Sequence, residues 1–437
     1  MLTQARTSFT RIVAGLRSPL YLNGYALIAS AIAMSGLGFV FWVLAARLYP
    51  PAAVGASSAL VSLLMFLAGI AQLNLRGALI RFLPLAGLAA RRLILGAYAA
   101  SLGASLLCGG ATLLVARRWL PEEAFIITRP AFAAWFIISV AAQTIFALQD
   151  HVVTGLRRTL WVPVENLIYS LIKIALLIAL AGSALEPAIY FAYTVPMLAL
   201  VIPANYLIFS RWLPAHGAAS DQAEKQMSFE RLVRFVAGDY LGSLFALAST
   251  TLVPVLVAIA LGTEANAYFY LPWVMVGALE LLAANMTASF TVEAARERAK
   301  MIVYSRRVLG QMLILLALAS VVMLPGAPLL LRIIGQEYAD ASAELLRLLV
   351  LSSVPQAVLA LAMSIARVEN RIRVIVALQA ANCGLLLSLS ALMLPALGIL
   401  AIGWAKLIAQ GGLALLMLGT ALRPLWRSRC GGVEVWR

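Results

Sequence analysis

Apolar residues in this chain come in long runs, and short polar or basic connections separate them. A helix needs about 20 apolar residues to cross the hydrocarbon core of a bilayer. Twelve runs meet or nearly meet that length: 22–46, 54–80, 93–116, 131–154, 162–181, 187–209, 233–261, 267–292, 308–331, 345–366, 374–395 and 398–422. The pattern therefore predicts an all-α polytopic membrane protein with about twelve transmembrane helices.

The composition supports this class. Of the 437 residues, 63% are hydrophobic and only 12% are charged, whereas a soluble domain carries about 25% charged residues. A water-soluble core cannot absorb so much apolar surface. The first run has no small-residue cleavage site at a normal distance, so we interpret it as an uncleaved first helix and not as a signal peptide.

The positions of the basic residues predict the orientation. The formal net charge is +15, which in a soluble chain would suggest nucleic-acid binding. Here most Lys and Arg residues lie in the connections on the side of the membrane that holds both termini. Because positive residues gather on the cytoplasmic side, both termini are expected in the cytoplasm. No nucleic-acid-binding motif accompanies these residues.

The second half of the chain resembles the first. LYLNGYALIAS from Leu20 is similar to RFVAGDYLGSL from Arg234, and the same offset aligns Gln72 with Asn285. Each repeat holds six spans, so the two lobes should be related by an axis along the membrane normal. We expect an N-terminal lobe over 1–210, a cytoplasmic linker over 211–231 and a C-terminal lobe with a basic tail over 232–437.

Three segments carry a resemblance to a known family. SPLYLNGYALIAS, FWVLAARLYPPAAVG and AQLNLRGALIRFLPLAG resemble the opening helices of bacterial polysaccharide-biosynthesis flippases of the multidrug/oligosaccharidyl-lipid/polysaccharide exporter superfamily. The resemblance implies alternating-access transport of a polyprenyl-diphosphate-linked oligosaccharide from the cytoplasmic to the outer leaflet of the bacterial cell membrane. It also implies other polysaccharide-assembly membrane proteins as candidate partners, and no cofactor.

Charged side chains inside predicted spans are the main site candidates, because burying a charge in a membrane is costly. We hypothesise that Arg76, Lys173 and Lys406 bind the diphosphate of a glycolipid. Two alternatives stay open: Arg76 can extend to the cytoplasmic interface, and Lys406 can pair with Asp239 or Glu280. Those two carboxyl groups are also candidates for a coupling proton.

Amide side chains are the second set of candidates, because sugars are recognised by many hydrogen-bond donors and acceptors. The amides in or near the spans are Asn23, Gln72, Asn74, Gln143, Gln149, Asn166, Asn285, Gln356, Gln379, Asn382 and Gln410. Gln72 and Asn74 are the preferred pair, since they are expected on the same helix as Arg76. For any single amide, a hydrogen bond between helices is the competing interpretation.

The sequence argues against an enzyme. It holds only two His and three widely spaced Cys residues, which match no metal site, and no catalytic motif is present. A membrane-bound polysaccharide polymerase or ligase would need a large outward loop, and the outward connections 117–130 and 332–344 are short. A cation-coupled exporter of small drugs remains the main alternative, and it predicts a compact carboxylate site.

Overall fold

The computed structural model describes residues 35–119, 129–183, 185, 187–217, 240–420 and 422–423. Within these ranges nearly all residues are helical, and no strand occurs. The first half contains a helix over Ser35–Leu48, then α3 (Pro51–Ala71), α4 (Leu75–Phe82), α5 (Ala90–Trp119), α6 (Pro130–Gly155), α7 (Trp161–Ala179), α8 (Ala188–Leu207) and α9 (Leu213–Gly217). The second half contains α11 (Tyr240–Leu261), α12 (Thr263–Arg296), α13 (Met301–Arg332), α14 (Gln336–Val368), α15 (Ile372–Leu397) and α16 (Leu400–Gly419).

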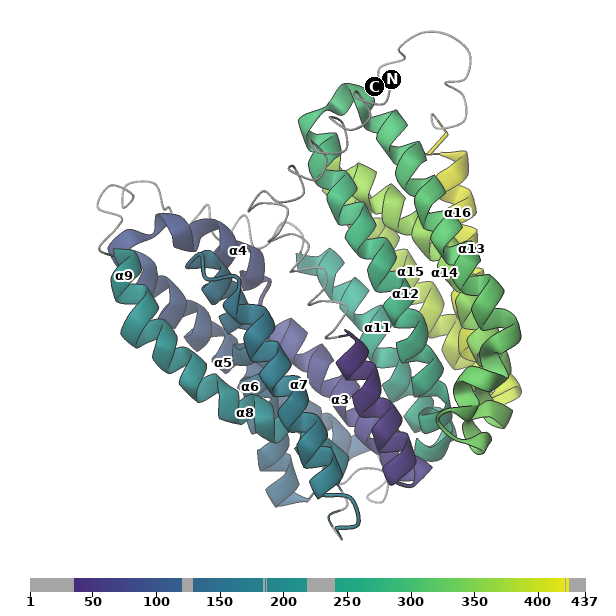
Figure 1. Cartoon of the computed structure of the whole chain (residues 1–437), viewed down its shortest axis with the longest axis horizontal. Helices are drawn as coiled ribbons and strands as arrows, with labels where there is room; N and C mark the ends of the chain where they lie inside the picture. Colours follow the sequence, from purple (N-terminus) through teal and green to yellow (C-terminus); the bar gives the residue numbers. More distant parts are fainter. Residues whose placement is uncertain are drawn as a thin grey trace, which may run out of the picture.

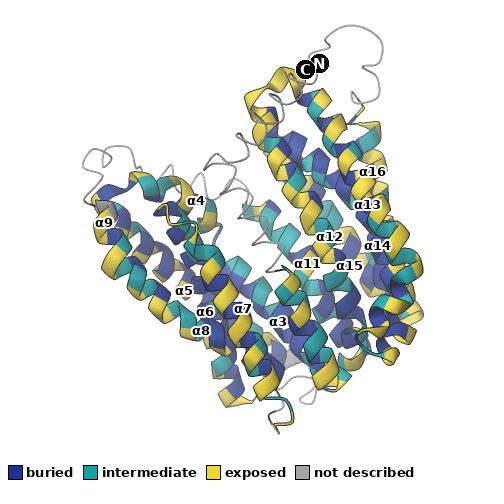
Figure 2. Cartoon of the chain, viewed as in Figure 1, coloured by how far each residue is buried: buried dark blue, intermediate teal, exposed yellow. Residues whose placement is uncertain are grey.

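Eleven helices of the described part are long and apolar enough to cross a membrane, and the apolar helix Ser35–Leu48 covers the second half of the first expected span. Their outward surfaces are apolar as well. On α13, Ile314, Val321 and Val322 are each more than 60% exposed, and Figure 2 shows such exposed stretches along the outside of the helices. Lipid is the solvent that accepts these side chains. The prediction of a polytopic α-helical membrane protein is confirmed.

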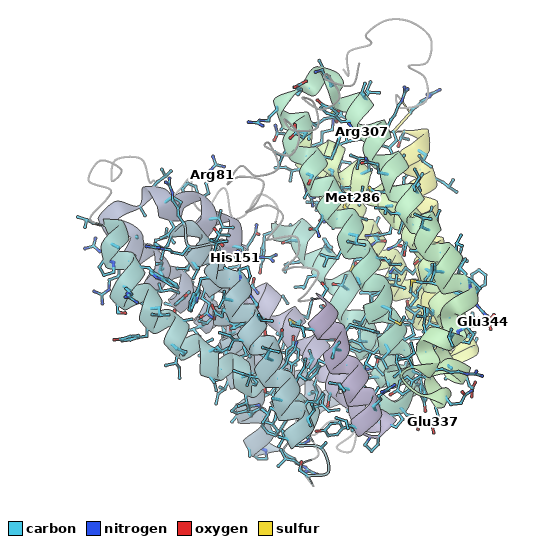
Figure 3. The ribbon with its side chains drawn as sticks, viewed as in Figure 1. Arg81, His151, Met286, Arg307, Glu337 and Glu344 are labelled. Atoms are coloured by element: carbon cyan, nitrogen blue, oxygen red, sulfur yellow. The ribbon has the colours of Figure 1, made fainter. Side chains whose placement is uncertain are left out.

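The helices form two lobes arranged as a V (Figure 1). We call Ser35–Leu48 to α9 the first lobe and α11 to α16 the second lobe. The lobes meet at one end, where α3 of the first lobe packs against both α11 and α12 of the second. Figure 3 shows Arg81 and Arg307 at the separated ends of the two arms, and Glu337 and Glu344 toward the end where the lobes meet. We call these the open end and the closed end.

A close crossing of α3 and α12 joins the lobes at the closed end. A Cβ atom added at Gly55 of α3 would lie 1.6 Å from the backbone oxygen of Thr263, so no larger residue fits there. The fully buried Asn266 on α12 donates a hydrogen bond to the Gly55 carbonyl oxygen at 2.8 Å and another to the Ser58 hydroxyl at 3.0 Å. The two lobes are therefore joined by backbone-level contact and by buried hydrogen bonds.

The expected span over 54–80 was wrong in its second half. The helix α3 ends at Ala71, Leu73 and Asn74 take left-handed backbone angles (φ 49° and 54°), and the chain resumes as the short helix α4. Asn tolerates this conformation better than most residues. No Gly or Pro marks the break, so the apolar pattern alone extended the span through it.

Within the second lobe, α16 packs closely on α14 at Gly403. A Cβ atom there would lie 2.7 Å from Cβ of Leu348, whereas Gly411 on the same helix has open space around it. We expect Gly403→Ala to destabilise the fold by about 1–3 kcal/mol through overpacking. Gly411→Ala should stabilise it by up to about 1 kcal/mol through helix propensity. Thermal unfolding of both variants in detergent checks this; a midpoint for Gly403→Ala equal to or above that of Gly411→Ala would contradict it.

Candidate functional site

A cavity of about 930 Å³ lies between the two lobes. The helix Ser35–Leu48, α3, α7 and α8 line it from the first lobe, and α11, α12, α13, α14 and α16 line it from the second. Most of its wall is apolar or aromatic: Trp42 contacts Tyr270 across the lobes, with ring centroids 4.7 Å apart. The charged side chains among the described lining residues are Lys173, Glu280 and Lys406.

Lys173 is enclosed by aromatic rings. Its Nζ atom lies 5.2 Å from the ring centroid of Phe41, 4.8 Å from that of Tyr169 and 5.3 Å from that of Tyr193. The residue is only 6% exposed, and within the described part of the chain no carboxylate pairs with it. Ring faces attract the ammonium, but they do not neutralise it. The side chain therefore presents an uncompensated positive charge to the cavity.

The helix α7 positions this lysine by its periodicity. Glu165, Tyr169 and Lys173 follow one another at intervals of four residues, so they lie on one face of the helix, and that face is buried. The Tyr169 hydroxyl donates a hydrogen bond to the backbone oxygen of Tyr193 on α8 at 3.0 Å. This bond fixes one wall of the aromatic enclosure, so the lysine is held in place before any ligand arrives.

Lys406 on α16 has a different environment. Its Nζ atom forms an ion pair with Glu280 on α12, with Nζ and Oε1 2.5 Å apart, and lies 4.6 Å from the ring centroid of Trp273. The lysine side chain is 4% exposed and the glutamate side chain 20%. Of the two pairings expected for Lys406, the structure has the one with Glu280; Asp239 lies outside the described residues.

A smaller pocket of about 130 Å³ adjoins this ion pair and lies within the second lobe. Four amides from three helices line it: Gln356, Gln379, Asn382 and Gln410. The side-chain oxygens of the last three are buried and have no hydrogen-bond partner. Unpaired buried acceptors are costly, so this pocket is suited to a ligand that donates hydrogen bonds.

The other expected residues lie elsewhere. Arg76 is exposed on α4, Gln72 caps the end of α3, and Asn74 is in the break between the two helices. None of these three lines either cavity, and the idea that they share one helix was wrong because α3 ends before them. Sequence reasoning missed Trp273 and Tyr193, whose proximity to the lysines arises only from the packing of separate helices.

By sequence, no family model and no curated protein matches the chain. The fold does match solved structures. An inward-facing multidrug resistance MATE transporter of the MOP superfamily has a TM-score of 0.66 and 14% identity, covering 91% of this chain and 96% of that one. The lipid II flippase MurJ in an inward closed conformation has a TM-score of 0.64 and 11% identity, covering 91% and 87%. An outward-facing MATE structure has a TM-score of 0.60 and 16% identity, covering 91% and 92%. The chain therefore has the two-lobed, twelve-helix fold of these transporters.

Proposed function

We propose that this protein is a flippase that moves a polyprenyl-diphosphate-linked oligosaccharide from the cytoplasmic to the outer leaflet of a bacterial cell membrane by alternating access. The observation that carries the proposal is Lys173, a buried cation without a carboxylate partner in the described structure, facing a cavity large enough for a lipid headgroup. A diphosphate would supply the negative charge that pairs with this lysine.

The electrostatics of the cavity favour an anion. Two lysines and one glutamate supply the formal charges of its described lining, and Glu280 is already paired with Lys406. The aromatic wall excludes water around Lys173, which strengthens the attraction of an oxyanion. A phosphate oxygen at the lysine would form a charge-assisted hydrogen bond.

The smaller pocket in the second lobe has polar side chains that suit the sugar portion of the lipid-linked oligosaccharide. The unpaired amide oxygens of Gln379, Asn382 and Gln410 can each accept a hydrogen bond from a sugar hydroxyl. Trp273 lines both this pocket and the larger cavity, and an indole face packs well against a sugar ring. With the diphosphate at Lys173, the sugars would extend toward this pocket.

The two-lobed shape supports alternating access. The lobes are tightly joined at the closed end through Gly55 and Asn266 and separate toward the open end (Figure 1). Arg81 and Arg307 lie at the open end (Figure 3), which by the positive-inside rule is cytoplasmic. On this proposal the structure represents an inward-facing state, and the higher TM-score to the inward-facing than to the outward-facing MATE structure supports that assignment. The similar fold of the lipid II flippase MurJ supports the proposal of a lipid-linked cargo.

Export of a cationic drug is the alternative function. The substitution Glu280→Gln distinguishes it from the flippase. If the cargo is a diphosphate, Glu280→Gln removes a competing anion and frees Lys406, so affinity should rise several-fold. If the cargo is a cationic drug, the same change removes the only carboxylate of the described lining and affinity should fall.

The experiment measures binding of a short-chain polyprenyl diphosphate and of a cationic dye to purified wild type and Glu280→Gln. Glu293→Gln, which removes the same charge outside the cavity, is the control. Tighter diphosphate binding in Glu280→Gln supports the flippase. Weaker dye binding together with no diphosphate binding by the wild type would overturn it.

A further inference from the structure

The first lobe carries a short amphipathic segment at the open end that the proposed cavity does not use. It consists of α4 and two short 3-10 helices, η1 (Leu83–Leu85) and η2 (Gly87–Ala89), and it leads directly into α5. Arg81, near the end of α4, lies at the open end (Figure 3). With eight residues, α4 is roughly 12 Å long, so it is too short to cross a membrane.

One face of this segment is packed against the body of the lobe. Leu79, Leu83 and Ala86 are buried and belong to one apolar cluster with side chains of α5 and α6. Gly155 of α6 permits this close packing, because a Cβ atom there would lie 2.9 Å from the backbone oxygen of Leu79. The segment is therefore held in a fixed position on the lobe.

The remaining side chains of the segment combine apolar and basic groups on the surface. Ile80, Leu85 and Leu88 are between 42% and 72% exposed. Four arginines of the same stretch are exposed as well: Arg76, Arg81, Arg91 and Arg92. The chain has no Asp or Glu before Glu122. The boundary between lipid and water suits this combination, since the apolar side chains enter the acyl region and the arginines stay at the headgroups.

The second lobe has no equivalent of this segment within its described residues. RRLILG from Arg91 resembles RRVLG from Arg306, so the beginnings of α5 and α13 correspond. However, α12 continues without a break to Arg296, and Lys300 in the following connection is paired with Glu297. The broken helix and the basic stretch without carboxylates are therefore specific to the first lobe.

We propose that the segment from Leu75 to Arg92 binds the phosphate headgroups of anionic phospholipids in the leaflet at the open end. The exposed apolar side chains would enter the acyl region, and the arginines would contact phosphate oxygens, for which a guanidinium is well suited. Each basic residue near an anionic membrane surface strengthens association by about fivefold. A lipid surface fits better than an acidic protein, because the exposed leucines directly adjoin α5, a helix long enough to cross the membrane.

The segment also lies on the side of the first lobe where the V opens (Figure 1). Arg76 is within electrostatic range of His151 on α6, and Figure 3 shows His151 on the flank of the first lobe that faces the second. Anionic lipids held by the segment would therefore lie beside the opening between the lobes. Binding of anionic phospholipid does not rest on the proposed function, whereas loading of a lipid-linked diphosphate from this surface would.

The test uses the purified full chain with its native cysteines replaced and a fluorophore attached through Leu88→Cys. The protein is placed in bilayers of equal parts phosphatidylcholine and phosphatidylglycerol, and one of the two lipids carries bromine atoms on its acyl chains. Bromine quenches the fluorophore on contact, so the two bilayers together give the relative affinity of this position for each lipid. We expect phosphatidylglycerol to be preferred by at least about fivefold, and the preference to fall at high salt.

Two double variants show whether the preference comes from this segment. Arg91→Gln/Arg92→Gln removes two charges close in sequence to the fluorophore and should bring the preference near to one. Arg306→Gln/Arg307→Gln removes the same charge from the corresponding positions of the second lobe, and it should leave the preference unchanged.

Absence of quenching by either brominated lipid would show that the segment is in water and would overturn the proposal. Equal quenching by the two lipids, or the same preference in both double variants, would overturn it as well, because headgroup recognition would then not come from this segment. If inorganic phosphate abolishes the preference and chloride at equal ionic strength does not, the segment binds free phosphate and the lipid assignment is wrong. If the arginine variants do not fold, the salt dependence of the chain with these arginines intact decides: a preference that falls with salt supports the proposal, and one that does not change overturns it.

Discussion

Lys173→Met should weaken the binding of a polyprenyl diphosphate by at least roughly thirtyfold, because truncating one member of a buried charge pair costs about 2–5 kcal/mol. Methionine keeps the length and apolar stem of lysine, so the packing against Phe41, Tyr169 and Tyr193 should persist. The change therefore removes the charge and little else. Binding of a fluorescent short-chain polyprenyl diphosphate to the purified protein measures the effect.

Lys300→Met is the matched control for this prediction. Lys300 is 61% exposed in the connection before α13, pairs with Glu297 and does not line the cavity. Its replacement should leave the affinity unchanged. If Lys173→Met binds the diphosphate as tightly as Lys300→Met does, the anion is bound elsewhere and the role given to Lys173 is wrong.

Gly55→Ala should open the closed end and shift the protein toward an outward-facing state. The new methyl group would lie 1.6 Å from the Thr263 backbone oxygen, so α3 and α12 must separate, and the hydrogen bonds of Asn266 are lost with them. Overpacking of this kind costs about 1–3 kcal/mol. A cost of about 1.4 kcal/mol already changes a conformational ratio tenfold.

The distance between spin labels at Leu88 and Val303 measures this shift. Both side chains are well exposed, at 72% and 63%, and lie on opposite lobes. They are close in sequence to Arg81 and Arg307, which Figure 3 shows at the open end. The native cysteines would first be replaced. In Gly55→Ala a shorter distance population should appear as the open end closes. Gly69→Ala is the comparison, since its new Cβ would meet only the flexible end of Leu247. An unchanged distance distribution in Gly55→Ala would contradict the role of this crossing.

The helices were predictable because each apolar run is sufficient by itself to specify a membrane span. The break at Leu73 and Asn74 was not, since neither residue is Gly or Pro, although both take left-handed backbone angles. That error placed Arg76 inside a span, whereas it is exposed on α4. Apolar content reports burial in lipid but does not report where a helix changes direction.

The charged part of the candidate cavity lining could be expected from the sequence. Lys173, Lys406 and Glu280 stand out as charges within apolar runs, and all three line the cavity. Most of their partners could not be predicted: the Phe41 and Tyr193 rings beside Lys173 come from other helices, and the pairing of Lys406 with Glu280 joins residues 126 positions apart. Such contacts depend on how separate helices pack against one another. The periodicity within one helix gives no information about that packing.

Translocation itself is the most direct test of the central claim. Proteoliposomes containing the wild type, Lys173→Met or Lys300→Met would receive a fluorescent polyprenyl-diphosphate-linked oligosaccharide, and a membrane-impermeant quencher would report its leaflet over time. The account predicts rapid exchange between leaflets with the wild type and Lys300→Met, and exchange near the protein-free rate with Lys173→Met. Exchange at the protein-free rate with the wild type, under conditions in which the same vesicles transport a cationic drug, would contradict it.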